Sequence, residues 1–233
     1  MFLPLHDDNP MRHLPRPYAN YTLIAFTILC FFMTGGLDPY AVEGAAYGLG
    51  YIPAVVHGPE VLAPGETIVP QTATYITYAF LHANWLHLLG NMAFLWVFGD
   101  NIEDALGHFR YIAFYLACAV AAAFVHGFAD PRSIVPLIGA SGAVAGVVGA
   151  YLVLHPRVKL WILLLGRVPI RLRAMWVLGF WALFQFFNIL VAPEDDMTAW
   201  WAHIGGMAAG ALLVIVLRRR GVQLFDAGTP VAD

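Results

Sequence analysis

Six long apolar runs constrain this chain more than any other feature of its sequence. Each has roughly the 17 to 25 residues that a helix needs to cross the hydrocarbon core of a bilayer. With 60% hydrophobic and only 12% charged residues, the chain has too little polar surface for a soluble globule. The sequence therefore predicts an all-α, polytopic integral membrane protein, with spans near residues 18–35, 79–98, 110–128, 137–155, 174–192 and 199–217.

A seventh apolar run, LWILLLG at residues 160–166, is too short to cross and lies between Lys159 and Arg167. We interpret it as an interfacial segment or a short helix within a loop. Neither terminal tail exceeds about 20 residues, so a separate soluble domain is not expected. The simplest organisation is one membrane domain over residues 1–233, with residues 36–78 as a long external loop.

The basic residues orient the predicted spans. Eleven of the twelve lie before the first span, after the sixth, or in the connections between spans two and three and between spans four and five; only Arg132 falls on the other side. Cytoplasmic connections of membrane proteins are enriched in Lys and Arg, so both termini are expected in the cytoplasm. The opposite face carries the loop at 36–78 and a short acidic loop at 193–197.

Other segments exclude several classes of protein. The first 17 residues hold four charges and four prolines but no apolar core, which predicts no cleavable signal peptide. Cys30 and Cys118 both fall inside spans, where a thiol is ordinarily an apolar filler, so no disulfide framework is expected. Neither a basic patch with interleaved aromatics nor a glycine-rich phosphate loop occurs, which argues against nucleic-acid and nucleotide partners.

Four polar side chains fall inside the predicted spans at comparable depth. Ser141 and His203 each lie about four residues into a span, or roughly 6 Å at the helical rise. His87 and Asn91 are one helical turn apart on a single face, roughly 12–18 Å into span two. The disagreement in depth suggests that the second helix begins later than residue 79 or is tilted. All four residues belong to the outer half of the bilayer.

The helical azimuths of these spans also converge. Asn84 joins the face of His87 and Asn91, whereas His82 is predicted on the opposite side of that helix. Stripes of small residues predict close packing of spans four and six. These stripes comprise Gly142, Gly146 and Gly149 in span four, and Gly206 and Gly210, beside His203, in span six.

Each polar residue taken singly has an ordinary explanation. A transmembrane Ser usually hydrogen-bonds the carbonyl four residues earlier, Asn91 could bridge helices, and the tryptophans of AWWAH suit an interfacial belt. An intramembrane His is more informative, because ionisable groups there are costly and usually functional. The combination predicts a hydrolytic site.

The chemistry of such a site assigns a role to each residue. Ser141 is a poor nucleophile until a base, His203, takes its proton. Spans two, four and six carry no Asp or Glu at that depth, so a dyad is expected instead of a triad. The Ser141 N–H, the Asn91 amide and the His87 ring would stabilise an oxyanion, and glycines such as Gly139 keep that backbone approachable.

Three motifs resemble the rhomboid intramembrane serine proteases: HANWLHLLGNMAFLWVFGDNIED, then GASG, then AHIGGMAAG, over roughly residues 70 to 217. The resemblance implies a six-helix rhomboid bundle with a short central fourth helix and a water-filled cavity open to the outer side. It assigns Ser141 as nucleophile, His203 as general base, and His87 with Asn91 to the oxyanion side. It also implies a structural role for Glu103.

Two positions depart from the family pattern. Many members place an aromatic residue four positions after the serine, against the catalytic His, and this chain has Ala145 there. What supports the His203 ring is therefore an open question. The loop at 36–78 contains no arginine, so the Trp-Arg pair of some members is missing.

The function expected is that of a serine-type endopeptidase, cleaving transmembrane helices of other membrane proteins near their outer ends. Its partners are these substrates and the lipid bilayer, with no nucleic acid, no metal and no cofactor; the oligomeric state stays open. The expected location is a bacterial or archaeal plasma membrane. Two alternatives are an inactive rhomboid-like protein that binds transmembrane helices, and a metalloenzyme using His82, His87 and His203, which lacks the HExxH spacing.

Overall fold

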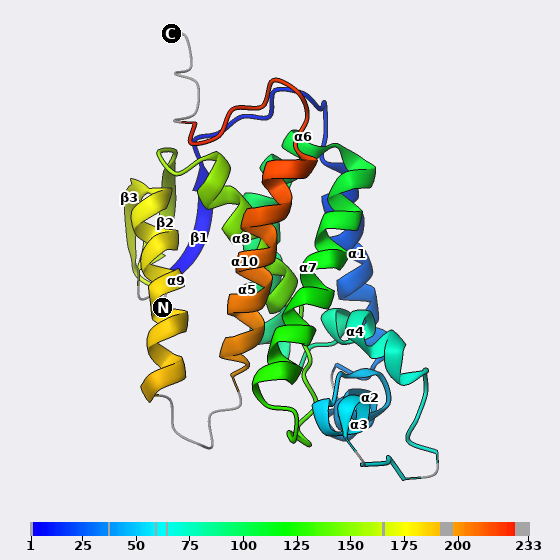
Figure 1. Cartoon of the computed structure of the whole chain (residues 1–233). Helices are drawn as coiled ribbons and strands as arrows, with labels where there is room; N and C mark the ends of the chain where they lie inside the picture. Colours follow the sequence, from blue (N-terminus) through cyan, green and yellow to red (C-terminus); the bar gives the residue numbers. More distant parts are fainter. Residues whose placement is uncertain are drawn as a thin grey trace, which may run out of the picture.

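The computed structural model describes residues 2–36, 38–58, 60–63, 65–164, 166–191 and 198–226. The acidic segment expected as a loop at 193–197 lies outside the described residues. The described part is a helical bundle with a small antiparallel sheet on one flank (Figure 1). The main helices are α1 (Tyr18–Met33), α5 (Trp85–Phe94), α6 (Asp100–Leu106), α7 (His108–Ala129), α8 (Ser141–Leu154), α9 (Ala174–Val191) and α10 (Trp200–Leu217).

Three of the described helices, α7, α9 and α10, are long and apolar enough to cross a membrane. Helices α1 and α8 are also apolar, but they are shorter, at 16 and 14 residues. All six predicted spans therefore contain a helix in the structure, but among the described helices three are by themselves long and apolar enough to cross a membrane.

The second predicted span begins later than its apolar run. Helix α5 starts at Trp85, because the side chain of Asn84 accepts a hydrogen bond from the backbone N–H of His87 at 2.9 Å and caps the helix. The helix then continues through a π-helical turn, η3 (Leu95–Gly99), into α6. The suspected late start is confirmed, and it moves His87 into the first turn.

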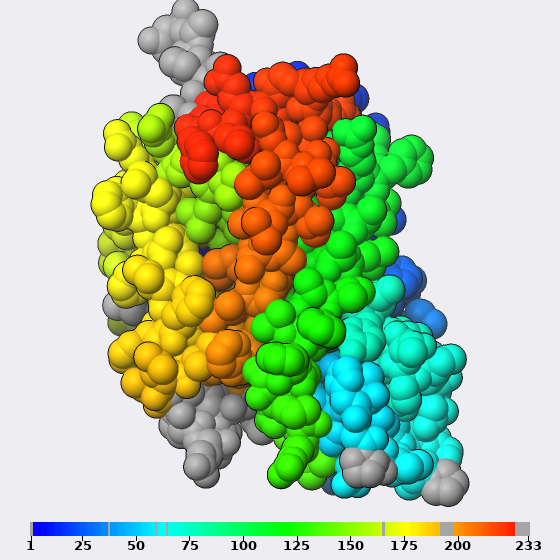
Figure 2. All heavy atoms as spheres, viewed as in Figure 1, coloured from blue at the N-terminus to red at the C-terminus, as the bar shows by residue number. Residues whose placement is uncertain are grey.

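Helix α8 forms the centre of the bundle, and most of its residues are buried. A side chain at Gly206 would place its Cβ 1.9 Å from the carbonyl oxygen of Gly142, and one at Gly210 would lie 1.9 Å from that of Gly146. The predicted glycine contact between spans four and six is therefore confirmed. In the space-filling view α10 occupies the surface between α9 and α7 (Figure 2).

The segment expected as an external loop contains several short helices. They are α2 (Pro39–Leu49), α3 (Pro53–His57) and α4 (Thr74–Thr77), and they gather at one end of the bundle (Figure 1). This end is tied to the start of α8, because the backbone N–H of Tyr51 donates to the Leu137 carbonyl at 3.1 Å.

Residues 160–164 do not form a short helix, and the expectation of an all-α fold is wrong, because this segment belongs to a sheet. Residues Lys159–Leu164 form strand β2, which pairs with β3 (Val168–Arg173) and with an N-terminal strand, β1 (Phe2–Asp7), in the order β1-β2-β3. Side chains along β2 alternate, with Leu160 and Ile162 buried and Trp161 exposed. A period of two suits a strand with one covered face, and the length of the run alone did not reveal it.

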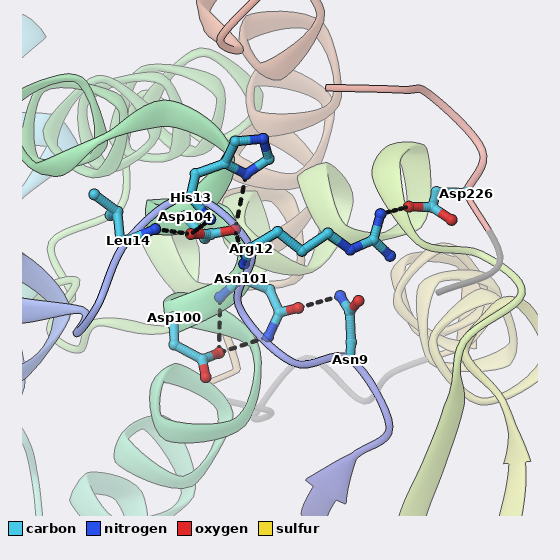
Figure 3. A network of polar contacts seen from close by, with 8 residues as sticks. All are labelled: Asn9, Arg12, His13, Leu14, Asp100, Asn101, Asp104 and Asp226. Carbon is cyan, nitrogen blue, oxygen red and sulfur yellow. Dashed lines mark hydrogen bonds and ion pairs between the residues drawn. The ribbon is translucent and has the colours of Figure 1, made fainter. Parts of the chain in front are cut away.

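An N-terminal clasp, residues 9–14, joins the first strand to the rest of the molecule (Figure 3). The carboxylate of Asp104 accepts hydrogen bonds from the backbone N–H groups of Arg12, His13 and Leu14 at 2.8, 2.8 and 2.6 Å. The guanidinium of Arg12 also reaches Asp226 at 2.8 Å. The clasp therefore holds both ends of the described chain against α6.

Glu103 has the structural role that the resemblance implied. Helix α1 has no side-chain cap of its own at Pro17. The buried carboxylate of Glu103 takes that place by accepting from the backbone N–H groups of Ala19 and Asn20 at 2.9 and 2.7 Å. A charged acceptor at a helix N-terminus is favoured by the helix dipole.

Candidate functional site

Ser141 and His203 meet at the start of two helices. Ser141 is the first residue of α8, and His203 lies in the first turn of α10. The distance from His203 Nε2 to Ser141 Oγ is 2.9 Å, which is a hydrogen bond. The close glycine contact between α8 and α10 brings the two side chains within reach.

The position of Ser141 at a helix terminus has an electrostatic consequence. The first backbone N–H groups of a helix have no acceptor within it, and they carry partial positive charge. Residues 138–140 approach the helix through Gly139, whose φ of +121° is in the region that favours glycine. The Ser141 hydroxyl therefore lies beside N–H groups suited to an anionic oxygen.

The ring of His203 is supported from helix α9 and from its own helix. The indole of Trp181 lies with its centroid 6.2 Å from that of His203, and Trp200 packs edge-on at 6.0 Å. The amide oxygen of Gln185 is 2.8 Å from His203 Nδ1. These three side chains support the His203 ring in place of the aromatic residue that many family members have at the position of Ala145.

His87 faces the turn that precedes the serine. Its Nδ1 is 3.5 Å from the backbone N–H of Ala83, at the outer limit of a hydrogen bond. If that N–H donates, the proton of the neutral ring is on Nε2. A Cβ at Gly139 would lie 2.6 Å from His87 Nε2, so only glycine fits against this ring.

Asn91 lies one turn further along α5 and is buried at 7% exposure. One N–H of its side chain donates to the carbonyl of His87 in the same helix at 3.0 Å. Among the hydrogen bonds of the described residues, none joins Asn91 to another helix. The amide has a second N–H, and Asn91 lines the cavity.

The expectation that His82 lies on the opposite side of the second helix is wrong. His82 precedes α5, and its ring packs against that of His87 with centroids 4.9 Å apart. The backbone N–H of Ala140 donates to His82 Nε2 at 3.4 Å. His82 therefore supports the turn before Ser141, because helix periodicity does not apply ahead of the Asn84 cap.

A cavity of 1040 Å³ joins these groups. Its walls include Ser141, His203, His87 and Asn91, whereas Gly139 contacts the His87 ring from outside the lining. Residues of α9, among them Trp181 and Asn188, form another part of the wall. Among the described residues, no group of three His, Cys, Asp or Glu side chains converges as metal ligands would.

Gln185 and Trp181 are the site residues that the sequence reasoning missed. One signal was available, because Gln185 and Asn188 are the polar residues of an otherwise apolar span at 174–191. Polar side chains inside a membrane generally face the bundle interior or a water-filled cavity. That rule applied to the fifth span would have directed attention to Gln185.

The fold and site together define a polytopic helical membrane protein with a hydrogen-bonded Ser–His pair in a cavity. The sequence also matches the Rhomboid domain over residues 69–220. The chain belongs to the rhomboid family and is an integral membrane protein.

Several relatives in this family are similar to the chain over part of its length. It is 41% identical to Rhomboid-like protein 11, chloroplastic, of Arabidopsis thaliana over 34% of the chain and 28% of that protein. It is 30% identical to Rhomboid protein 1, mitochondrial, of Saccharomyces cerevisiae over 62% of the chain and 41% of that protein. It is 26% identical to the Rhomboid protease GlpG of Klebsiella pneumoniae over 61% of the chain and 47% of that protein.

The chain spans less than half the length of each of these three relatives. Their names place family members in mitochondria and chloroplasts as well as in a bacterium. The expectation of a bacterial or archaeal plasma membrane is therefore unsupported.

Proposed function

We propose that the protein is an intramembrane serine endopeptidase that hydrolyses peptide bonds in or near transmembrane helices of other membrane proteins. The observation that carries the proposal is the 2.9 Å contact between Ser141 Oγ and His203 Nε2 in a cavity. A hydroxyl held against an imidazole nitrogen is the arrangement that activates a serine nucleophile. Membership of a family that includes a protease adds support.

The reaction follows from the proton positions. Ser141 Oγ attacks the scissile carbonyl carbon while His203 Nε2 takes the hydroxyl proton. The tetrahedral intermediate collapses, the C–N bond breaks, and His203 returns that proton to the leaving amine. A water molecule then attacks the acyl-enzyme, giving its proton to His203, and the Ser141 hydroxyl is restored when the ester bond breaks.

The oxyanion of each tetrahedral intermediate needs hydrogen-bond donors. The backbone N–H of Ser141 is one, since it belongs to the first turn of α8. Nε2–H of His87 and the second N–H of Asn91 are the others, with Gly139 keeping the backbone against the His87 ring. Such donors matter most where charge develops away from bulk water.

The proposed topology has six spans, with both termini on the cytoplasmic side and the α2–α4 end facing outward. The arginine distribution supports this orientation. The turn leading into α8 is bonded to residues of the outer end, so the cavity belongs to the outer half of the membrane. Water is available there, and a substrate helix must locally unwind before Ser141 reaches its carbonyl.

Serine-directed labelling tests the proposal. A fluorophosphonate should label the protein in membranes at Ser141, with or without a chelator, and Ser141→Ala should abolish both labelling and cleavage of a transmembrane substrate. His203→Ala should lower the rate to a similar level, and the double substitution should lose little more, because members of one catalytic unit are not additive.

Two results would point elsewhere. Substantial cleavage by Ser141→Ala would rule out the serine mechanism, and chelator-sensitive cleavage would favour a metalloenzyme. A folded, unlabelled and inactive native protein that still captures transmembrane helices would identify the helix-binding alternative.

A further inference from the structure

Gln185 has more contacts with the site than its place on a lipid-facing helix suggests. Its side chain is buried at 2% exposure, although α9 is mostly exposed. Its Nε2 donates to the carbonyl of Trp181 one turn earlier at 3.0 Å. Its Oε1 lies 2.8 Å from Nδ1 of His203.

The hydrogen bond to the Trp181 carbonyl determines which end of the Gln185 amide faces His203. A carbonyl oxygen only accepts hydrogen bonds, so the Trp181 carbonyl requires the NH₂ end of the Gln185 amide. The amide oxygen is then the end that faces His203, and Nδ1 of the imidazole must be the donor. In the neutral ring the proton is on Nδ1, which leaves the lone pair of Nε2 towards the Ser141 hydroxyl.

We propose that Gln185 is a positioning residue for the reaction, which holds His203 in the tautomer and orientation that the general base requires. This inference rests on the proposed protease function. Gln185 occupies the place that a carboxylate has in a Ser-His-Asp triad, where the third residue orients the ring and selects its tautomer. The site is thus a dyad completed by an amide acceptor.

The amide suits this position better than a carboxylate on physical grounds. An ionised Asp or Glu in the bilayer is costly, whereas a buried amide with its hydrogen bonds satisfied is not. The Trp181 and Trp200 rings pack against the imidazole and limit its movement. Gln185 adds a hydrogen bond to Nδ1, which fixes the ring orientation in a way that packing alone does not.

The location of Gln185 also makes α9 part of the catalytic unit. Only 22% of its span is buried, against 39% for α7, so α9 is less firmly packed into the bundle. Displacement of α9 from α10 would break the Gln185–His203 contact while leaving Ser141 and His203 on their own, tightly packed helices. Docking of α9 is therefore a condition for an oriented base.

Replacing Gln185 with Met tests the role, because Met keeps the length and fills the space but accepts no comparable hydrogen bond. We expect kcat to fall roughly 10- to 100-fold, part of the 10²–10⁴ that acid–base catalysis supplies, with little change in KM. Gln185→Glu, with its carboxyl protonated, keeps an oxygen acceptor towards His203 and an O–H donor towards the Trp181 carbonyl, and should recover much of the loss. Leu183→Met, the same replacement on the exposed face of α9, should leave kcat unchanged.

Rates are to be expressed per folded molecule, with thermal stability measured for each variant. A native kcat in Gln185→Met would overturn the positioning role, as would equal losses in the Met and Glu variants at a pH where the introduced carboxyl is protonated. ¹⁵N-histidine NMR of the unsubstituted protein tests it without a variant, since a neutral His203 ring protonated on Nε2 would also overturn it. An unlabelled, inactive native protein would instead overturn the proposed function.

Discussion

Ser141 illustrates how much a single position in a helix determines. The sequence placed it about four residues inside a span, where its hydroxyl would usually bond the carbonyl one turn earlier. In the structure it begins α8, so that interaction has no helical carbonyl before it, and the hydroxyl turns to His203. The residue types were readable from sequence, but the helix start that gives them their roles was not.

Substitution of Asn91 distinguishes two roles for this residue, oxyanion donor or packing residue. If its free N–H stabilises the oxyanion, Asn91→Ala should reduce the rate by roughly 10²–10³, the range for one lost donor. The folded protein should lose little stability, because among the described residues the Asn91 amide is hydrogen-bonded only within its own helix. Rate per folded molecule and thermal stability, measured together, check this.

His87→Ala is the variant to compare with Asn91→Ala. Because the His87 ring packs on Gly139, its removal is expected to lower both the rate per folded molecule and the thermal stability. Full turnover in Asn91→Ala would remove this residue from the proposed site.

At the scale of elements, helices were predictable and the sheet was not. An apolar run indicates a membrane-embedded helix without any knowledge of the helices it packs against. Five of the six predicted spans start within four residues of the first residue of the corresponding main helix. Strand β1 has no such signal, because it is defined by pairing with β2, where Phe2 meets Leu164. Gln185 was missed for a similar reason, since its role depends on how α9 docks.

Asp7, at the end of β1, predicts a pH dependence of stability. Burial raises its pKa to about 7 from an ordinary value near 3.8; the hydrogen bond from Tyr151 opposes the shift and the nearby Asp100 charge adds to it. The folded protein therefore holds this proton more tightly than the unfolded chain. The stabilisation is fully present below about pH 3.8 and is lost as pH rises towards 7.

We accordingly expect the Tm of the purified protein to be lower at pH 8 than at pH 5. Asp7→Asn should reduce that difference, because an amide stays neutral at both values. Leu5→Asn, the same replacement at an exposed position of β1, should retain it. An unchanged pH dependence in Asp7→Asn would show that β1 does not carry the effect.

The whole molecule has two chemically different ends. One carries the clasp with Arg12, Asp226 and Arg219, whose backbone N–H donates to the Ala105 carbonyl of α6, and the other carries α2, α3 and α4 (Figure 1). Charge distribution is a property of the entire chain, so this polarity could be derived from sequence without knowledge of the packing. The depth of the cavity could not, because it depends on where α5 and α8 begin.

Cysteine accessibility tests the orientation. In a background without Cys30 and Cys118, Glu43→Cys should react with an impermeant thiol reagent added outside intact cells, and Arg167→Cys should react only after permeabilisation. Both positions are exposed, so burial does not explain a difference. The reverse pattern would place the cavity in the cytoplasmic half and contradict the proposed position of the site in the outer half of the membrane.

The clasp also imposes an order on biosynthesis. Strand β1 and residues 9–14 are synthesised before the helices, yet β2 follows only after α8, and Asp226 lies 214 positions beyond Arg12. Contacts between such distant segments form late, because the intervening chain must be ordered before they compensate for its entropy. Residues 12–14 can therefore pair with Asp104 once α6 has formed. Strand β1 has no partner until β2 follows, and the contact between Arg12 and Asp226 forms only after α10.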